Sequence, residues 1–139
     1  MTTRNVILRL NAIFLLFVGI VQCISELLSH FLGAGPLAGR FTASPYTIGF
    51  FEAHGLAALI GLLMFRASTG KPDQIWHLFA ASVHLLLGGA NLLFWDSFVR
   101  LEFVPVGIVA TVFHSIFFLA QVGCYFQERI PYMSKEGHA

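Results

Sequence analysis

The chain has 139 residues, of which 57% are hydrophobic and only 11% are Asp, Glu, Lys or Arg. Soluble domains carry about a quarter charged residues, so eight basic and seven acidic side chains are too few to cover a soluble protein of this length. A formal charge of +1 gives no reason to expect a nucleic-acid partner, which would call for a clustered basic surface. Together with a mean hydropathy of +0.78, this composition predicts a protein embedded in a lipid bilayer.

Four segments have the length that a membrane crossing requires. A helix needs about 20 mostly apolar residues to cross a hydrocarbon layer of about 30 Å. The segments at about 6–32, 46–65, 74–95 and 101–127 meet this requirement. Ser44 and Pro45 precede the second segment, where a hydroxyl can cap a helix and a proline can begin one. We therefore expect an all-α fold, with residues 1–139 forming one domain, an antiparallel bundle of four transmembrane helices.

The connections between these spans differ in length. Residues 33–39 are rich in glycine and open a loop of about a dozen residues, long enough to cover the mouth of a cavity. The links at 67–73 and 96–100 are short. The second, third and fourth spans should therefore be antiparallel neighbours.

The basic residues predict the orientation of the chain in the membrane. Two of them, Arg40 and Arg100, fall on one side of the bilayer. The other six fall on the side of the two termini: Arg4, Arg9, Arg66, Lys71, Arg129 and Lys135. Because cytoplasmic loops carry the excess of Lys and Arg, we expect a multi-pass protein of the inner or plasma membrane with both termini cytoplasmic.

Polar residues recur at helical spacing within three of the spans. These stripes hold Asn11, Gln22, Ser25, Glu26 and Ser29 in the first span, His77, His84 and Asn91 in the third, and Thr111, His114 and Gln121 in the fourth. Such side chains usually face the interior of a membrane bundle, because hydrocarbon cannot satisfy them. In the second span, Glu52 and His54 point about 200° apart and cannot both face the interior.

Several kinds of site are compatible with these residues. If His84 and His114 face one another, they could ligate a b-type haem or donate hydrogen bonds to a quinone, with Asn91 and Gln22 as further contacts. His54 with Glu26 or Glu52 could hold a transition metal, but no compact ligand motif is present, so we assign no metal site. Buried His and Asn can also do no more than bond across helices.

Four segments of the first two spans form a recognisable pattern: Ile7–Leu10, Phe14–Ile20, Phe50–Leu56 and Ile60–Met64. In these segments the chain resembles the DoxX-like group of small bacterial four-helix membrane proteins. In that group an arginine opens the first helix and a glycine follows, and the second helix carries a glutamate, a small residue and a Gly-Leu pair. The resemblance implies membrane-bound redox work, as in subunits of thiosulfate:quinone oxidoreductase, and singles out Arg9 and Glu52 as polar contacts.

The leading hypothesis is a small redox-associated subunit that binds a quinone-like or haem-like cofactor through His84 and His114. With such short loops it should act with a protein partner or as a homo-oligomer. One alternative is a solute or proton carrier that uses Glu26, Glu52 and His54. Another is an assembly subunit without chemistry of its own. No pattern identifies catalytic residues, so whether the protein is an enzyme stays open.

Overall fold

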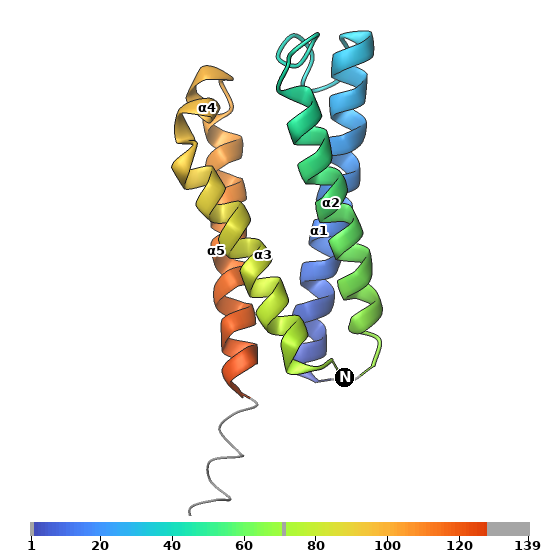
Figure 1. Cartoon of the computed structure of the whole chain (residues 1–139), viewed down its shortest axis with the longest axis vertical. Helices are drawn as coiled ribbons and strands as arrows, with labels where there is room; N and C mark the ends of the chain where they lie inside the picture. Colours follow the sequence, from blue (N-terminus) through green and yellow to red (C-terminus); the bar gives the residue numbers. More distant parts are fainter. Residues whose placement is uncertain (1, 71, 128–139) are drawn as a thin grey trace, which may run out of the picture. The chain divides into compact units, whose positions relative to one another are not determined.

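A computed structural model describes residues 2–70 and 72–127, and within them the regular secondary structure is helical, without strands. Figure 1 shows the elements in order: α1 (Thr3–Leu32), α2 (Thr47–Ala67), α3 (Gln74–Leu93), α4 (Trp95–Arg100) and α5 (Val104–Gln127). All except α4 are long and apolar enough to cross a membrane, which confirms the predicted all-α class and the four candidate spans. Lys71, Arg129 and Lys135, on which the orientation partly rests, lie outside the described residues.

The third connection departs from the expected short link. Residues 95–100 form the one-and-a-half-turn helix α4, so the last span begins at Val104 instead of near residue 101. Glu102 adopts a left-handed backbone conformation, with φ of 59°, directly before α5 begins. A non-glycine residue rarely takes this conformation. Because no glycine lies at this position, the turn could not be predicted from the sequence.

The chain divides into two compact units, one of residues 9–66 and the other of residues 1–8 together with 67–139. The first unit is a hairpin of α1 and α2 (Figure 1). Two glycines allow these helices to approach closely: a Cβ added to Gly61 would lie 2.6 Å from the backbone nitrogen of Leu16, and one added to Gly19 would lie 2.6 Å from the carbonyl oxygen of His54. Small residues at membrane helix contacts permit such backbone approach.

The long loop of this unit folds onto the end of the hairpin. Gly33, with φ of 59°, ends α1. The hydroxyl of Ser29 donates to the carbonyl of Leu37 at 2.7 Å, and the hydroxyl of Thr47 donates to the carbonyl of Phe41 at 3.2 Å. Phe41 is buried and contacts the ring of Phe50. The loop is therefore tied to both helices that it connects.

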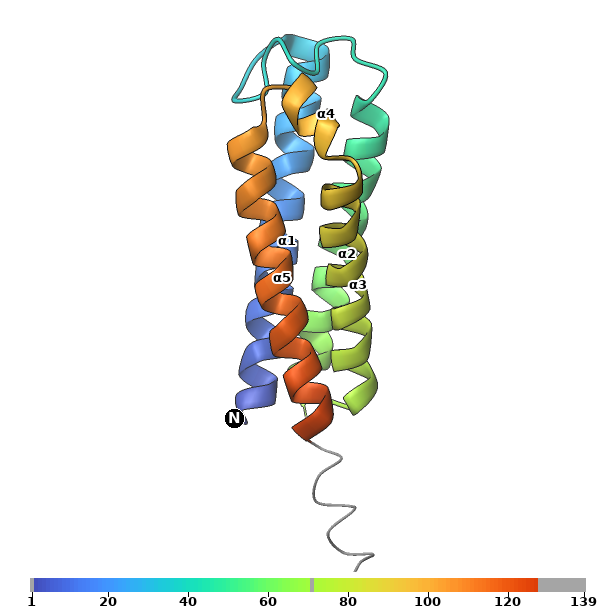
Figure 2. The same cartoon turned by 90° about the vertical axis from the view of Figure 1, so that its left-hand side faces the viewer.

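The second unit is a hairpin of α3 and α5, with α4 at the turn between them (Figure 2). Gln74 Nε2 donates to the carbonyl of Tyr125 at 2.7 Å near one end of this hairpin. Near the other end, Gly107 is buried directly beneath the ring of Phe98 on α4. Between them, Gly88 allows α5 to approach, because its missing Cβ would lie 3.2 Å from Cβ of His114.

Candidate functional site

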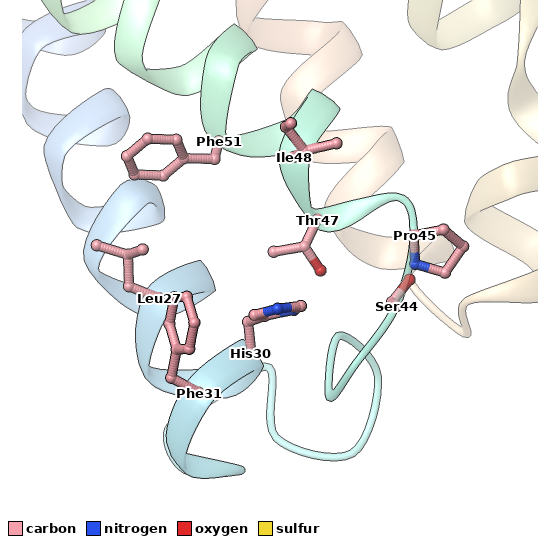
Figure 3. A pocket seen from close by; sticks show the side chains of 8 residues that line it. All are labelled: Leu27, His30, Phe31, Ser44, Pro45, Thr47, Ile48 and Phe51. Atoms are coloured by element: carbon pink, nitrogen blue, oxygen red, sulfur yellow. The ribbon is translucent and has the colours of Figure 1, made fainter.

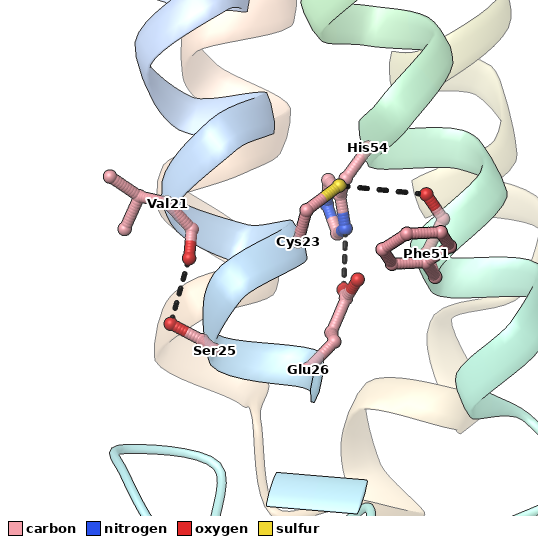
Figure 4. Close-up of polar contacts among 6 residues, drawn as sticks. All are labelled: Val21, Cys23, Ser25, Glu26, Phe51 and His54. Carbon is pink, nitrogen blue, oxygen red and sulfur yellow. Dashed lines mark hydrogen bonds and ion pairs between the residues drawn. The ribbon is translucent and has the colours of Figure 1, made fainter. Parts of the chain in front are cut away.

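The first unit holds a buried carboxylate–imidazole pair. Glu26 on α1 is 1% exposed, and its Oε1 lies 2.6 Å from Nδ1 of His54 on α2, as Figure 4 shows. The other oxygen, Oε2, is buried without a hydrogen-bond partner among the described residues. A proton in so short a contact can reside on either atom, and proton-handling sites in membranes are built from such acids and histidines. The pair is therefore a candidate site for proton exchange.

The surroundings of this pair are apolar or already bonded. The His54 ring stacks at 25° on the ring of Phe50. Cys23 Sγ lies 3.6 Å from the carbonyl oxygen of Phe51, to which the thiol donates (Figure 4). Ser25 donates to the carbonyl of Val21 in its own helix. The hydroxyl and thiol hydrogens of Ser25 and Cys23 are therefore already used. Glu26 Oε2 can still form a hydrogen bond with a ligand.

The structure does not bring Glu52 or Arg9 into this site. Glu52 is exposed on α2, because it lies about 200° around the helix from His54, as its spacing predicted. The Arg9 guanidinium instead stacks on the ring of Phe65, 5.6 Å from its centroid, near the other end of α2. Arg9 and Glu52 therefore make no contact with one another, and the predicted path through Glu26, Glu52 and His54 is reduced to Glu26 and His54.

The second unit joins the two histidines that the sequence singled out. His84 on α3 and His114 on α5 face each other, with 2.9 Å between their Nδ1 atoms and 5.1 Å between ring centroids. His84 is buried and stacks on Phe117 at 21°. One ring must donate Nδ1–H and the other must accept it. Consequently the pair has one Nε2 that accepts a hydrogen bond and one Nε2–H that donates.

This arrangement does not fit a haem between the two histidines. Two imidazoles that ligate one haem iron lie on opposite faces of the macrocycle, which separates the two rings. Here the rings are in direct contact, with 5.1 Å between their centroids and a hydrogen bond between their Nδ1 atoms. The contact of Gly88 with Cβ of His114 leaves no slot for a planar ring at this level. A hydrogen-bonding role toward a carbonyl ligand remains compatible with the pair.

The two residues grouped with these histidines lie in different places. Asn91 is two turns beyond His84 on α3, and its Nδ2 is buried without a hydrogen-bond partner in the described part of the chain. Gln22 is half-buried on α1 and belongs to the other unit. Asn91 thus shares a helix face with His84 and offers a free donor.

The sequence analysis missed two polar features that the structure reveals. His77 and Gln121 are both fully buried and share a hydrogen bond of 2.6 Å between Nδ1 and Oε1. Both lie on the predicted stripes, so their pairing could have been anticipated once the third and fourth spans were aligned antiparallel. His30 was not singled out, although it follows Glu26 by four residues and so lies on the same face of α1.

A groove lies at the end of the first unit, between the last turn of α1, the loop and the first turn of α2 (Figure 3). It has a volume of about 300 Å³. Its walls are apolar, from Leu27 and Phe31 on α1 and Ile48 and Phe51 on α2. Ser44 and Pro45 of the loop also line it, in keeping with the expectation that this loop could cover a cavity. One helical turn separates the groove from Glu26 and His54.

Comparison with protein-family models, with curated proteins and with solved structures finds no match to this chain. The resemblance to the DoxX-like group therefore stays an expectation drawn from the first two spans. The two polar pairs are assigned on their geometry alone.

Proposed function

We propose that this chain is a small redox-associated membrane subunit that binds a quinone-like ligand and exchanges protons with it. The observation that carries the proposal is the Glu26–His54 pair, in which a carboxylate that is 1% exposed keeps one oxygen unpaired. A quinone takes up two protons together with two electrons when an electron donor of a partner protein reduces it, and a buried acid beside the quinone can supply one of these protons. Intramembrane acids and histidines are the usual means of moving protons through a membrane protein.

We place the quinone oxygen beside Glu26 Oε2, because this buried atom has no partner in residues 2–70 and 72–127. The protonated carboxyl group donates this hydrogen bond and the quinone oxygen accepts it. His54 holds the carboxyl group in place through Oε1. The His84–His114 pair is the competing location, since it joins two imidazoles inside the α3/α5 hairpin, and Asn91 Nδ2, two turns further along α3, is buried without a hydrogen-bond partner among the described residues. The resemblance to the DoxX-like group supports the redox association but not either location.

Quinone binding to the purified protein in nanodiscs tests the proposal and separates the two locations. The probe is ubiquinone-1, measured by equilibrium dialysis. We expect Glu26→Leu to weaken binding about tenfold, the loss of about 1.4 kcal/mol that a hydrogen bond to an ionisable group supplies, while His84→Phe leaves it unchanged. The reverse pattern would move the site to the α3/α5 hairpin. No binding by the unaltered protein would refute the function.

A proton carrier without a ligand is the second candidate, favoured by the same short Glu26–His54 contact. It predicts proton uptake into proteoliposomes when a membrane potential is applied. Glu26→Gln should abolish this uptake, and the exposed Glu52→Gln should not. Quinone binding without any proton flux would reject the carrier and leave the first candidate standing.

The orientation and assembly of the chain belong to the same proposal. We place both termini in the cytoplasm and expect the chain to act with a protein partner or with further copies of itself, since its loops are too short to hold a soluble catalytic domain. A C-terminal reporter fusion that is active only in the cytoplasm tests the orientation. Activity of a periplasm-dependent reporter at that end would contradict it.

A further inference from the structure

The groove at the end of the α1/α2 hairpin combines apolar walls with hydrogen-bonding groups that have spare capacity (Figure 3). His30 Nδ1 is buried and lacks a hydrogen-bond partner within the described residues. The oxygen of Ser44 accepts a hydrogen bond from the backbone N–H of Tyr46, which leaves its own O–H to donate. Buried polar atoms in native proteins are nearly always bonded. The groove therefore offers two polar contacts to a ligand.

The walls of the groove are open to the medium around the helices. Ile48 is 69% exposed and Phe31 is 73% exposed, although both are large apolar side chains. In a chain whose long helices are apolar enough to cross a membrane, such exposure faces lipid. The groove lies where one candidate membrane span ends and the next begins, which places it toward the boundary of the hydrocarbon layer. A ligand can enter it sideways from the bilayer.

The charges near the groove favour an uncharged ligand. No Lys or Arg lines it, and Arg40 of the loop is not among the lining residues. Two carboxylates are one helical turn away in sequence: Glu26 precedes His30 by four residues, and Glu52 follows Ile48 by four. A phosphate or a carboxylate would lie near the Glu52 carboxylate here, with no Lys or Arg among the lining residues that the structure describes to balance it. A volume of about 300 Å³ is at the lower end for small-molecule sites, which suits one part of a larger molecule.

We propose that this groove binds the ester end of an uncharged membrane lipid of the diacylglycerol type. The upper part of an acyl chain packs against Leu27, Phe31, Ile48 and Phe51. An ester carbonyl accepts a hydrogen bond from Ser44, and His30 bonds to the glycerol hydroxyl or to the second ester. This site does not depend on quinone binding at Glu26, which lies one turn deeper.

Native mass spectrometry of the full chain in detergent tests the site, with dioleoylglycerol as the probe. Ile48→Trp fills the groove and should lower the bound fraction at least tenfold. Leu59→Trp is the matched control, because Leu59 is a similarly exposed apolar residue of the same helix, at 60% against 69%, and lies outside the groove. Equal binding by the Ile48→Trp variant and the unaltered chain would overturn the proposal.

The polar contacts and the ligand class are tested separately. Ser44→Ala should weaken binding about fivefold, as expected for the loss of one neutral hydrogen bond, and the exposed Ser82→Ala should have no effect. His30→Leu should weaken binding similarly, and His30→Gln should restore it in part. Preferential binding of oleate, phosphatidylglycerol or ubiquinone-1 over dioleoylglycerol, with the same sensitivity to Ile48→Trp, would assign the groove to that ligand and reject an uncharged ester.

Discussion

Glu26 of α1 and His54 of α2 share a hydrogen bond of 2.6 Å while the second oxygen of Glu26 is buried and unbonded. The two residues come from helices that Gly19 and Gly61 bring into backbone contact. His54 is 27% exposed, so the carboxyl group of the pair is enclosed while the imidazole lies partly at the surface of the helices.

Loss of His54 should destabilise the protein more than a conservative change of Glu26. His54→Leu leaves a buried carboxyl group without its partner, which typically costs about 3–5 kcal/mol for a fully buried pair. Glu26→Gln keeps an acceptor for His54 and should cost about 1 kcal/mol or less. Unfolding in mixed micelles, followed by circular dichroism, measures both. Equal effects of the two substitutions would show that the contact contributes no specific stability, and Glu52→Gln provides the exposed control.

The glycines between α1 and α2 should tolerate no side chain. Gly61→Ala places a methyl group 2.6 Å from the Leu16 nitrogen, and the helices must separate to admit it. Overpacking of this kind costs about 1–3 kcal/mol, measured in the same unfolding experiment. Gly49→Ala is the matched control on α2, because nothing lies within 4 Å of its added Cβ. Unchanged stability of Gly61→Ala would contradict the close approach of the two helices.

The histidine pair of the second unit should show a fixed arrangement of protons. Because Nδ1 of His84 and Nδ1 of His114 lie 2.9 Å apart, one must carry a hydrogen and the other must not. Nitrogen-15 NMR of labelled histidines should therefore find one protonated and one unprotonated Nδ1 for this pair. His114→Ala should shift the His84 signals, and Ser115→Ala, which removes a hydroxyl bonded within its own helix, should not. Two identical tautomers would refute the direct bond.

Haem should not bind between these histidines. Their Nδ1 atoms are bonded to each other, and Gly88 packs against the Cβ of His114. Titration of the purified protein with haemin should give no low-spin spectrum of a haem with two imidazole ligands. A Soret band that disappears in both His84→Ala and His114→Ala would show instead that the pair opens to admit the cofactor.

Much of this architecture could be predicted from the sequence, because hydrophobic length and helical spacing are local properties. The stripe on α3 predicted a shared inward face for His77, Ala81, His84, Gly88, Asn91 and Trp95. The first four are buried, and Asn91 and Trp95 are half-buried. The pairing of His84 with His114 followed from antiparallel spans. The partner of Glu26 did not, because the sequence left open whether Glu52 or His54 faces the interior, and only the rotation of α2 about its axis decides between them.

Other features depend on contacts that spacing does not encode. The helix α4 was not predicted, and its residues were interpreted as a short link. It is too short to display a hydrophobic periodicity, and only Phe94 separates it from α3. His30 lines the groove together with Ser44 of the loop. Because the loop conformation could not be predicted, neither could this role of His30. Such features depend on how separate segments of the chain pack together, and the relative positions of these segments cannot be predicted from helical spacing.

Infrared difference spectroscopy of the protein with bound ubiquinone-1, recorded between the oxidised and electrochemically reduced ligand, tests the central claim most directly. If Glu26 exchanges a proton with the ligand, the spectrum should contain a band in the carbonyl-stretching region of protonated carboxylic acids. That band should be absent from Glu26→Gln, shifted in His54→Gln and unchanged in Glu52→Gln. A difference spectrum with no carboxylic-acid band, or a band that persists in Glu26→Gln, would contradict the assignment of Glu26 as the proton-exchanging group.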